Sequence, residues 1–214
     1  MIIVKPNGGL GNRMRVIHSA MLLARLRGQK KITVLWKKDD GLNAGFYQSF
    51  EPVPNVCIRQ NLAVMGLQFY TFKNLPGFRF IDDNILLKHR YDKAFWLQGT
   101  KNFLINGCFD FLPHEEENLY SFFKPVSEIR GRVEKLKQSF SPFTIGVQIR
   151  RTDNVPAITN SPVEWFVKEM NKAVLANSEV TFFLCTDDTE CENQMRNLFG
   201  NRILTQPGKS LSRN

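Results

Sequence analysis

The 214-residue chain lacks long hydrophobic runs, and its start lacks the pattern of a secretory signal. No apolar stretch approaches the roughly 18 residues that a membrane-spanning helix needs. The apolar N-terminal run is interrupted by Pro6 and Gly8, which is too early for a signal peptide. The sequence therefore predicts a soluble, cytoplasmic protein without a transmembrane segment.

The chain is also poor in cysteine and histidine, which argues against a disulfide framework and a zinc site. It has four cysteines, at positions 57, 108, 185 and 191, and three histidines, at positions 18, 89 and 114. No Cys-x-x-Cys pair occurs, and no histidine lies at a zinc-type spacing from a cysteine. We predict reduced thiols that pack as small apolar side chains, and no metal site.

Acidic residues are the minority among the charges. The chain has 29 Lys and Arg against 20 Asp and Glu, a net charge of +9. This balance favours an anionic partner, such as nucleic acid, an anionic surface or a phosphorylated small molecule. The basic residues are spread along the chain, without an arginine-rich tract, an RNA-binding aromatic motif or a zinc finger. Nucleic-acid binding is therefore not favoured.

The apolar pattern at the N-terminus indicates a βαβ unit. The strand Ile2–Val4 is followed by a glycine turn at 8–11, by apolar residues at helical spacing up to Gly28, and by a second strand at 32–36. This order favours a parallel sheet and an α/β fold. Further along, the acidic run 115–117 predicts a solvated helix start, and short strands are predicted at 55–59, 78–81, 95–97 and 103–105.

A second Rossmann-like unit is predicted in the C-terminal half. An amphipathic helix over 126–140 precedes a β-α-β-α-β pattern whose strands lie at 144–149, 180–185 and 203–204. Ser161-Pro162-Val163-Glu164 predicts a capping box with Pro162 at the first helical position. We expect two domains, 1–124 and 125–214.

Three segments at strand ends are candidates for binding an anionic ligand. Gly9 and Gly11 lie between a predicted strand and a predicted helix, and the first N–H groups of such a helix suit an anion. The dinucleotide-binding fingerprint is incomplete here, and no Walker lysine follows. A tight turn without a ligand is the alternative for this segment.

The pair Arg150-Arg151 follows the predicted strand 144–149, and ligands of open α/β sheets bind beyond the carboxyl ends of strands. Two planar cations suit a diphosphate. The alternative is that both arginines bridge to acids such as Asp153 or are solvated. Asp187-Asp188 follows the next strand in the same way. One of these carboxylates can cap the following helix while the other accepts hydrogen bonds from a ligand.

Together, these segments resemble a known family. Gly9-Leu10-Gly11-Asn12-Arg13, then GVQIRRTD at 146–153, then FLCTDD at 183–188 are similar to the GDP-fucose-dependent fucosyltransferases. That superfamily includes the α1,2-, α1,6- and protein-O-fucosyltransferases and the nodulation fucosyltransferases. The arginine-containing segment is the specific part of the resemblance.

The resemblance implies a GT-B enzyme with two Rossmann-like domains facing a cleft. Such enzymes move fucose from GDP-fucose to a glycan hydroxyl with inversion, and need no metal or other cofactor. By the resemblance, Arg150 is the catalytic group at the β-phosphate, Asp187 or Asp188 approaches the guanine edge, and Asn12 contacts donor or acceptor. The implied donor-binding residues are Gly9, Gly11, Asn12, Gln148, Arg150, Arg151, Asp187 and Asp188.

Two departures from the family pattern are visible. Gln148 stands where many relatives have a histidine, and glutamine carries no proton at neutral pH. The family also continues into a further strand and a Ser-x-Phe-Ser segment, whereas this chain ends at Asn214. The second domain is therefore expected to be truncated. A non-catalytic nucleotide- or anion-binding protein of the same fold is the alternative function.

Overall fold

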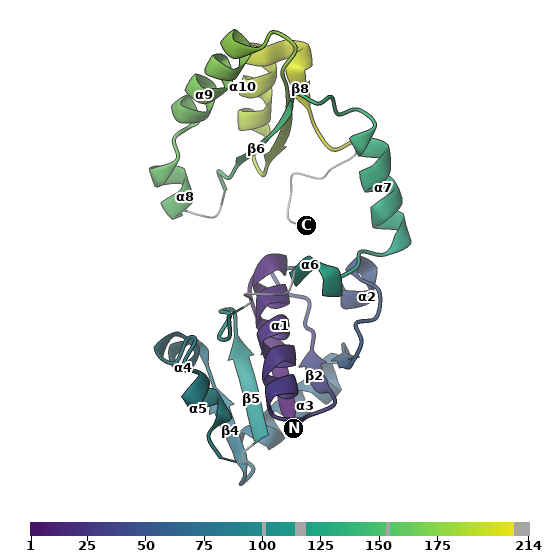
Figure 1. Ribbon diagram of the computed structural model, residues 1–214, viewed down its shortest axis with the longest axis vertical. Coiled ribbons are helices and arrows are strands. Elements are labelled where there is room, and N and C mark those ends of the chain that lie inside the picture. The colour runs from purple at the N-terminus through teal and green to yellow at the C-terminus, as the bar shows by residue number, and fades with distance from the viewer. Residues whose placement is uncertain (100–101, 114–118, 153–154, 208–214) are drawn as a thin grey trace. The chain divides into compact units, whose positions relative to one another are not determined.

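The computed structural model describes residues 1–99, 102–113, 119–152 and 155–207, and divides into two compact units (Figure 1). Unit 1 is Met1–Arg130 and unit 2 is Gly131–Asn214, whereas the sequence suggested a division at 124/125. The acidic run 115–117 and Asp153 lie outside the described residues. Within the described ranges, no helix is long and apolar enough to cross a membrane.

Unit 1 is built on a five-stranded, fully parallel sheet in the order β3-β2-β1-β5-β4. The strands are β1 (Ile2–Pro6), β2 (Ile32–Leu35), β3 (Val56–Arg59), β4 (Phe78–Ile81) and β5 (Asn102–Gly107). The chain first adds strands on one side of β1 and then returns to its other side, so the strand order reverses between β1 and β5. This confirms the parallel sheet that the N-terminal βαβ pattern predicted.

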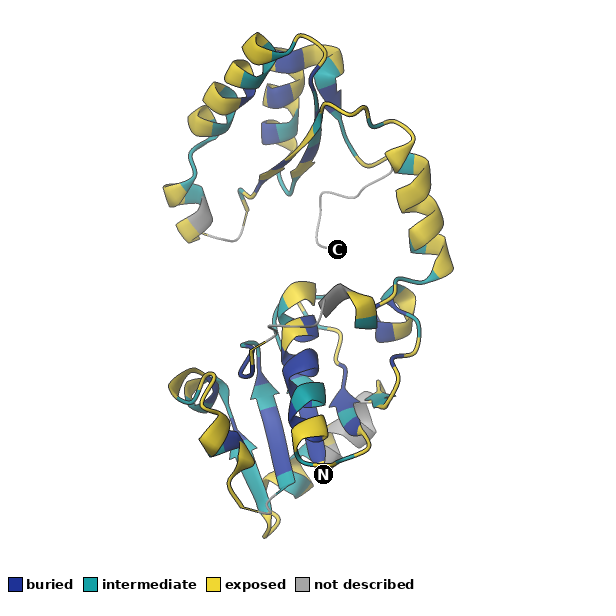
Figure 2. Cartoon of the chain, viewed as in Figure 1, coloured by how far each residue is buried: buried dark blue, intermediate teal, exposed yellow. Residues whose placement is uncertain are grey.

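The helices of unit 1 pack around this sheet. They are α1 (Leu10–Leu26), α2 (Phe46–Ser49), α3 (Leu62–Lys73), α4 (Asp83–Lys88), α5 (Lys93–Leu97) and α6 (Leu119–Phe122). The core of unit 1 includes Val4 of β1 and Ile17 of α1, which are both fully buried. Figure 2 shows that much of α1 is buried. The helix α1 ends where Gly28 adopts a left-handed φ of 63°, as the sequence predicted.

One predicted strand of unit 1 is wrong. Residues 95–97 lie in α5, because Asp92 caps this helix by accepting a hydrogen bond from the Phe95 N–H at 3.1 Å. The Trp96 ring is fully buried, and its indole N–H donates to the His89 carbonyl at 2.9 Å. A short aromatic run is compatible with either structure, and here the cap and the core decide for a helix.

Unit 2 holds a three-stranded parallel sheet in the order β6-β7-β8. Its elements are β6 (Thr144–Ile149), α8 (Val155–Asn160), α9 (Val163–Ala176), β7 (Thr181–Thr186), α10 (Thr189–Phe199), the 3-10 turn η1 (Gly200–Arg202) and β8 (Ile203–Leu204). One face of the sheet packs Val147 and Leu184 against Met170 and Met195 of the helices. The β-α-β-α-β order predicted for this half is confirmed.

Two details of the predicted helices in the C-terminal half need correction. The predicted helix over 126–140 forms as α7 (Ser127–Lys137), but none of its residues is buried, so its apolar positions do not form a core face (Figure 2). The predicted capping box at Ser161 is wrong, because Pro162 is the N-cap residue of α9 and makes no side-chain cap hydrogen bond. Proline fixes the extended entry into the helix without supplying a hydroxyl.

Candidate functional site

The glycine turn after β1 leads directly into α1. Gly8 has the left-handed φ of 75°, and a Cβ there would lie 2.9 Å from the Asn12 amide nitrogen. Gly9 is the N-cap residue in an extended conformation and Gly11 is already helical, so neither has a positive φ. Both are exposed, and Gly9 offers no side-chain cap. Because no side chain among the described residues caps α1, its first N–H groups can donate to a ligand.

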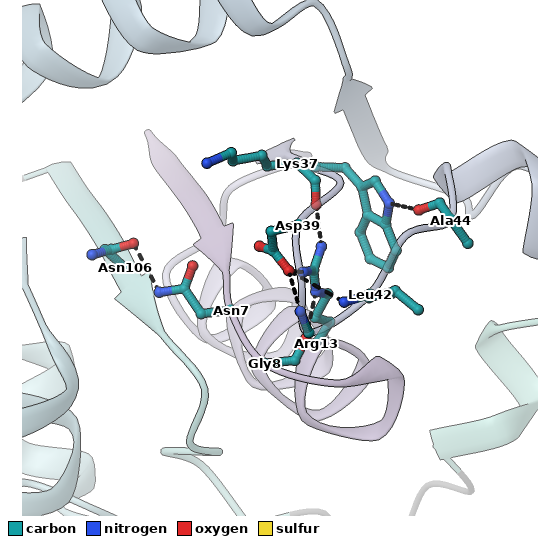
Figure 3. A network of polar contacts seen from close by, with 10 residues as sticks. Asn7, Gly8, Arg13, Lys37, Asp39, Leu42, Ala44 and Asn106 are labelled. Carbon is teal, nitrogen blue, oxygen red and sulfur yellow. Dashed lines mark hydrogen bonds and ion pairs between the residues drawn. The ribbon is translucent and has the colours of Figure 1, made fainter. Parts of the chain in front are cut away.

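Arg13 is the residue of this turn that sequence reasoning missed. Its side chain is fully buried, and Nε donates to the Gly8 carbonyl at 2.8 Å (Figure 3). One terminal nitrogen donates to the Lys37 carbonyl and the other pairs with Asp39 Oδ1 at 2.6 Å. The guanidinium also lies 5.0 Å from the centroid of the Trp36 ring. Burial lowers the pKa of Arg13 and outweighs the opposing effect of Asp39, but an arginine guanidinium stays charged at neutral pH.

Asp39 connects Arg13 to the loop that follows β2. The same Oδ1 accepts hydrogen bonds from the N–H groups of Gly41 at 3.0 Å and Leu42 at 3.2 Å. A Cβ at Gly41 would lie 3.3 Å from the Gly8 carbonyl, so the two loops pack backbone to backbone. The sequence did contain a signal for this role of Arg13, because position 13 falls on the same buried face of α1 as Ile17. A charged side chain at such a position is rarely buried unless it is paired with an opposite charge or with hydrogen-bond acceptors.

Arg150 lies at the carboxyl end of β6, as predicted. Its Nε is 4.0 Å from Asp187 Oδ2, the outer limit of an ion pair, and 44% of its side-chain surface is exposed. Gln148 is exposed two residues earlier, on the sheet face that does not pack against α9 and α10. The register pairs Gln148 with Cys185, which is also exposed. A guanidinium and an amide are thus accessible at one strand end.

Arg151 differs from its neighbour, because its guanidinium donates hydrogen bonds to backbone carbonyls of its own unit. The guanidinium donates to the carbonyl oxygens of Ile158, at 3.3 Å, and Ser161. Its backbone N–H donates to Asp187 Oδ1 at 2.7 Å. These contacts hold the segment that contains α8 against the end of β6. A donor-binding role for Arg151 stays a prediction.

The two aspartates after β7 divide their roles. Asp188 caps α10, with its Oδ1 accepting from the N–H groups of Glu190 at 2.7 Å and Cys191 at 3.4 Å. Asp187 joins the ends of β6 and β7 through the Arg151 N–H and the Thr152 hydroxyl, the latter at 2.7 Å. Partial burial raises the pKa of Asp187, but these hydrogen bonds outweigh it, so the pKa lies below its ordinary value.

Because the pKa of Asp187 is depressed in the folded state, its stabilising effect is present above the unfolded-state pKa and is lost as the pH falls through the folded-state pKa. Asp187→Asn keeps the size of the side chain and one of the two acceptor oxygens, and removes the titration. We expect its melting temperature to fall less than that of the wild type between about pH 6 and about pH 3, as followed by circular dichroism. Asp40→Asn, at an exposed carboxylate, is the control and should keep the wild-type acid sensitivity. Equal acid sensitivity of Asp187→Asn and the wild type would contradict this assignment.

The described residues contain no cluster of three or more His, Cys, Asp or Glu side chains that could hold a metal ion. All four cysteines are free thiols. Burial, with a smaller effect of Asp83, raises the pKa of Cys108, and burial also raises that of Cys191. Neither thiol is thereby activated as a nucleophile.

Comparison with known proteins shows where this fold occurs. No protein-family model and no curated protein matches the sequence. A crystal structure of the fucosyltransferase NodZ from Bradyrhizobium matches 98% of this chain and 79% of its own, with a TM-score of 0.63 and 20% identity. The chain has the fold of the NodZ fucosyltransferases. The fold therefore agrees with the resemblance that the sequence motifs indicated.

Two further NodZ structures relate this fold to a nucleotide. A NodZ α-1,6-fucosyltransferase soaked with GDP-fucose matches 99% of this chain and 79% of its own, with a TM-score of 0.61 and 19% identity. The enzyme co-crystallised with GDP matches 96% and 78%, with a TM-score of 0.63 and 20% identity.

Proposed function

We propose that this protein is an inverting, metal-independent glycosyltransferase that moves fucose from GDP-fucose to a glycan hydroxyl. The accessible guanidinium of Arg150 carries the proposal, because it follows a parallel strand in a fold shared with NodZ fucosyltransferases. The proposal assigns the donor to unit 2 and the acceptor to unit 1, as in the GT-B enzymes that the motifs resemble.

Arg150 stabilises the leaving group in the proposed reaction. As the bond between fucose and GDP breaks, negative charge grows on the diphosphate. A fixed guanidinium with several N–H donors interacts more strongly with this charge in the transition state than in the ground state, and this difference raises the rate. The exposed Gln148 amide can donate a further hydrogen bond to the same phosphates.

The hydrogen bonds favour Asp188 over Asp187 as the guanine-binding residue. Both oxygens of Asp187 accept hydrogen bonds from the end of β6. In Asp188, Oδ1 caps α10, whereas Oδ2 accepts no hydrogen bond from the described residues. A carboxylate oxygen suits the N1–H and N2–H edge of guanine. We therefore assign the base contact to Asp188 and a scaffolding role to Asp187.

Nucleotide preference tests this proposal. Calorimetric titration with GDP, ADP and UDP should show tighter binding of GDP, and EDTA should leave that affinity unchanged. We also expect the protein to release GDP when it is incubated with GDP-fucose. Equal, weak binding of the three nucleotides would reject the proposal, and GDP binding without any turnover would favour a non-catalytic nucleotide-binding protein instead.

A further inference from the structure

The reversal of strand order between β1 and β5 marks a place in unit 1 where a ligand is expected. In open α/β sheets, ligands bind outside the carboxyl ends of the strands at such a switch point, because neighbouring connections leave the sheet on opposite sides. In unit 1 the two strand ends are Pro6 in β1 and Gly107 in β5, which are partners in the register.

A pair of asparagines lies at this point. Asn7 follows β1 and its backbone N–H donates to the Gly107 carbonyl at 2.9 Å. Its side-chain Nδ2 donates to Asn106 Oδ1 at 3.0 Å, so the two amides bridge the two strand ends (Figure 3). Both side chains are partly exposed. The contact leaves one acceptor, Asn7 Oδ1, and one donor, Asn106 Nδ2, without a hydrogen-bond partner among the described residues.

The backbone around this pair is held in place. Gly8 takes its left-handed conformation directly after Asn7. Gly107 has no room for a side chain, since a Cβ would lie 2.5 Å from Asp83 Oδ1, which itself accepts from the Cys108 N–H at 2.8 Å. Two amides on such a rigid support lose little freedom when they bind a ligand, so each hydrogen bond contributes more of its strength.

The chemistry of the pair suits neutral hydroxyls rather than an anion. A sugar hydroxyl both donates and accepts, so two neighbouring hydroxyls match one free acceptor and one free donor. The register places Lys5 beside Asn106, but the Lys5 ammonium lies over the Phe69 ring, 4.8 Å from its centroid. We propose that Asn7 and Asn106 bind neighbouring hydroxyls of the acceptor sugar. This inference rests on the proposed function, since it names where the acceptor of that reaction binds.

One substitution separates recognition from mere strand pairing. In Asn106→Asp, a carboxylate oxygen still accepts from Asn7 Nδ2, so the internal contact survives, whereas the outward donor is replaced by an acceptor. A structural role predicts no effect, whereas a sugar-binding role predicts weaker binding by about tenfold. Asn84→Asp, at an exposed position in α4, is the matched control. Asn7→Ala, which removes the outward acceptor, serves if Asn106→Asp does not fold.

The probes are the methyl β-glycosides of glucose, galactose, mannose and N-acetylglucosamine, titrated into the ¹⁵N-labelled 214-residue chain with and without GDP. We expect at least one glycoside to shift the Asn7 side-chain amide resonance, with an affinity that falls about tenfold in Asn106→Asp and is unchanged in Asn84→Asp. In Asn7→Ala, the Asn106 amide takes over as reporter and should show the same loss.

Two outcomes overturn the inference: no glycoside shifts the amides, or Asn106→Asp binds as well as the wild type. Calorimetry with GDP on the same samples keeps this failure apart from that of the proposed function. Sugar binding at the amides without GDP binding would retain the hydroxyl site and reject fucosyl transfer from GDP-fucose. GDP binding without any sugar-induced shift would reject the hydroxyl site and leave the proposed fucosyl transfer from GDP-fucose standing.

Discussion

Replacing Arg150 with alanine is expected to reduce turnover of GDP-fucose by about 10²- to 10³-fold, because one fixed donor at a developing negative charge typically contributes that much. The side chain lies at the end of β6 with nearly half of its surface exposed, so its removal should leave the fold intact. The measurement is the initial rate of GDP release from GDP-fucose, with circular dichroism to verify folding.

Arg150→Lys refines this prediction. Lysine keeps the positive charge but loses the planar pair of donors, so its rate should lie between those of the wild type and Arg150→Ala. Arg132→Ala, at an exposed arginine of α7, removes the same charge elsewhere and should retain full turnover. Unchanged turnover in Arg150→Ala would refute the catalytic assignment, and equal losses in Arg150→Ala and Arg132→Ala would show a non-specific charge effect.

The second large effect is expected at Arg13. Replacing it with alanine leaves Asp39 without its cationic partner and frees the carbonyls of Gly8 and Lys37 within the loop junction. Breaking a fully buried ion pair by removing one partner typically costs about 3–5 kcal/mol of the free energy of unfolding. Because the Asp39 side chain is 31% exposed, we expect a loss at the lower end of that range. Urea unfolding followed by tryptophan fluorescence tests this, since the buried Trp36 and Trp96 both lie in unit 1.

The control for Arg13 lies on the same helix. Arg15 is exposed, and Arg15→Ala should change the free energy of unfolding by no more than about 0.5 kcal/mol. A loss in Arg13→Ala as small as that in Arg15→Ala would mean that the two loops are held together by other contacts. Because the turn beside Asn12 loses its support, we also expect weaker ligand binding at the N-terminus of α1 in Arg13→Ala.

Much of the fold was predictable because local pattern and tertiary structure agree. The strands at 78–81 and 144–149 coincide with β4 and β6, since each is an apolar run bounded by turn residues. The error at 95–97 arose where pattern alone is ambiguous. An aromatic run of that length fits a buried strand or a short helix, and the Asp92 cap decides between them.

The candidate site was predictable in position but only partly in role. The sequence placed Arg150 and Asp187 at strand ends, because a strand that stops before a polar segment is visible in the residue order. It did not distinguish Arg150, which is half exposed, from Arg151, whose guanidinium binds carbonyls near α8. Two adjacent arginines point to opposite sides of an extended chain, and only the surroundings show which side is covered.

The sequence by itself determined the parallel strands, the helices that follow them and the polar residues at their carboxyl ends, because these depend on periodicity and neighbours along the chain. Only the tertiary structure decided that Arg13 joins the loops after β1 and β2, and that Asn7 meets Asn106. These partners are far apart in sequence, and their pairing follows from strand order, which residue spacing does not encode.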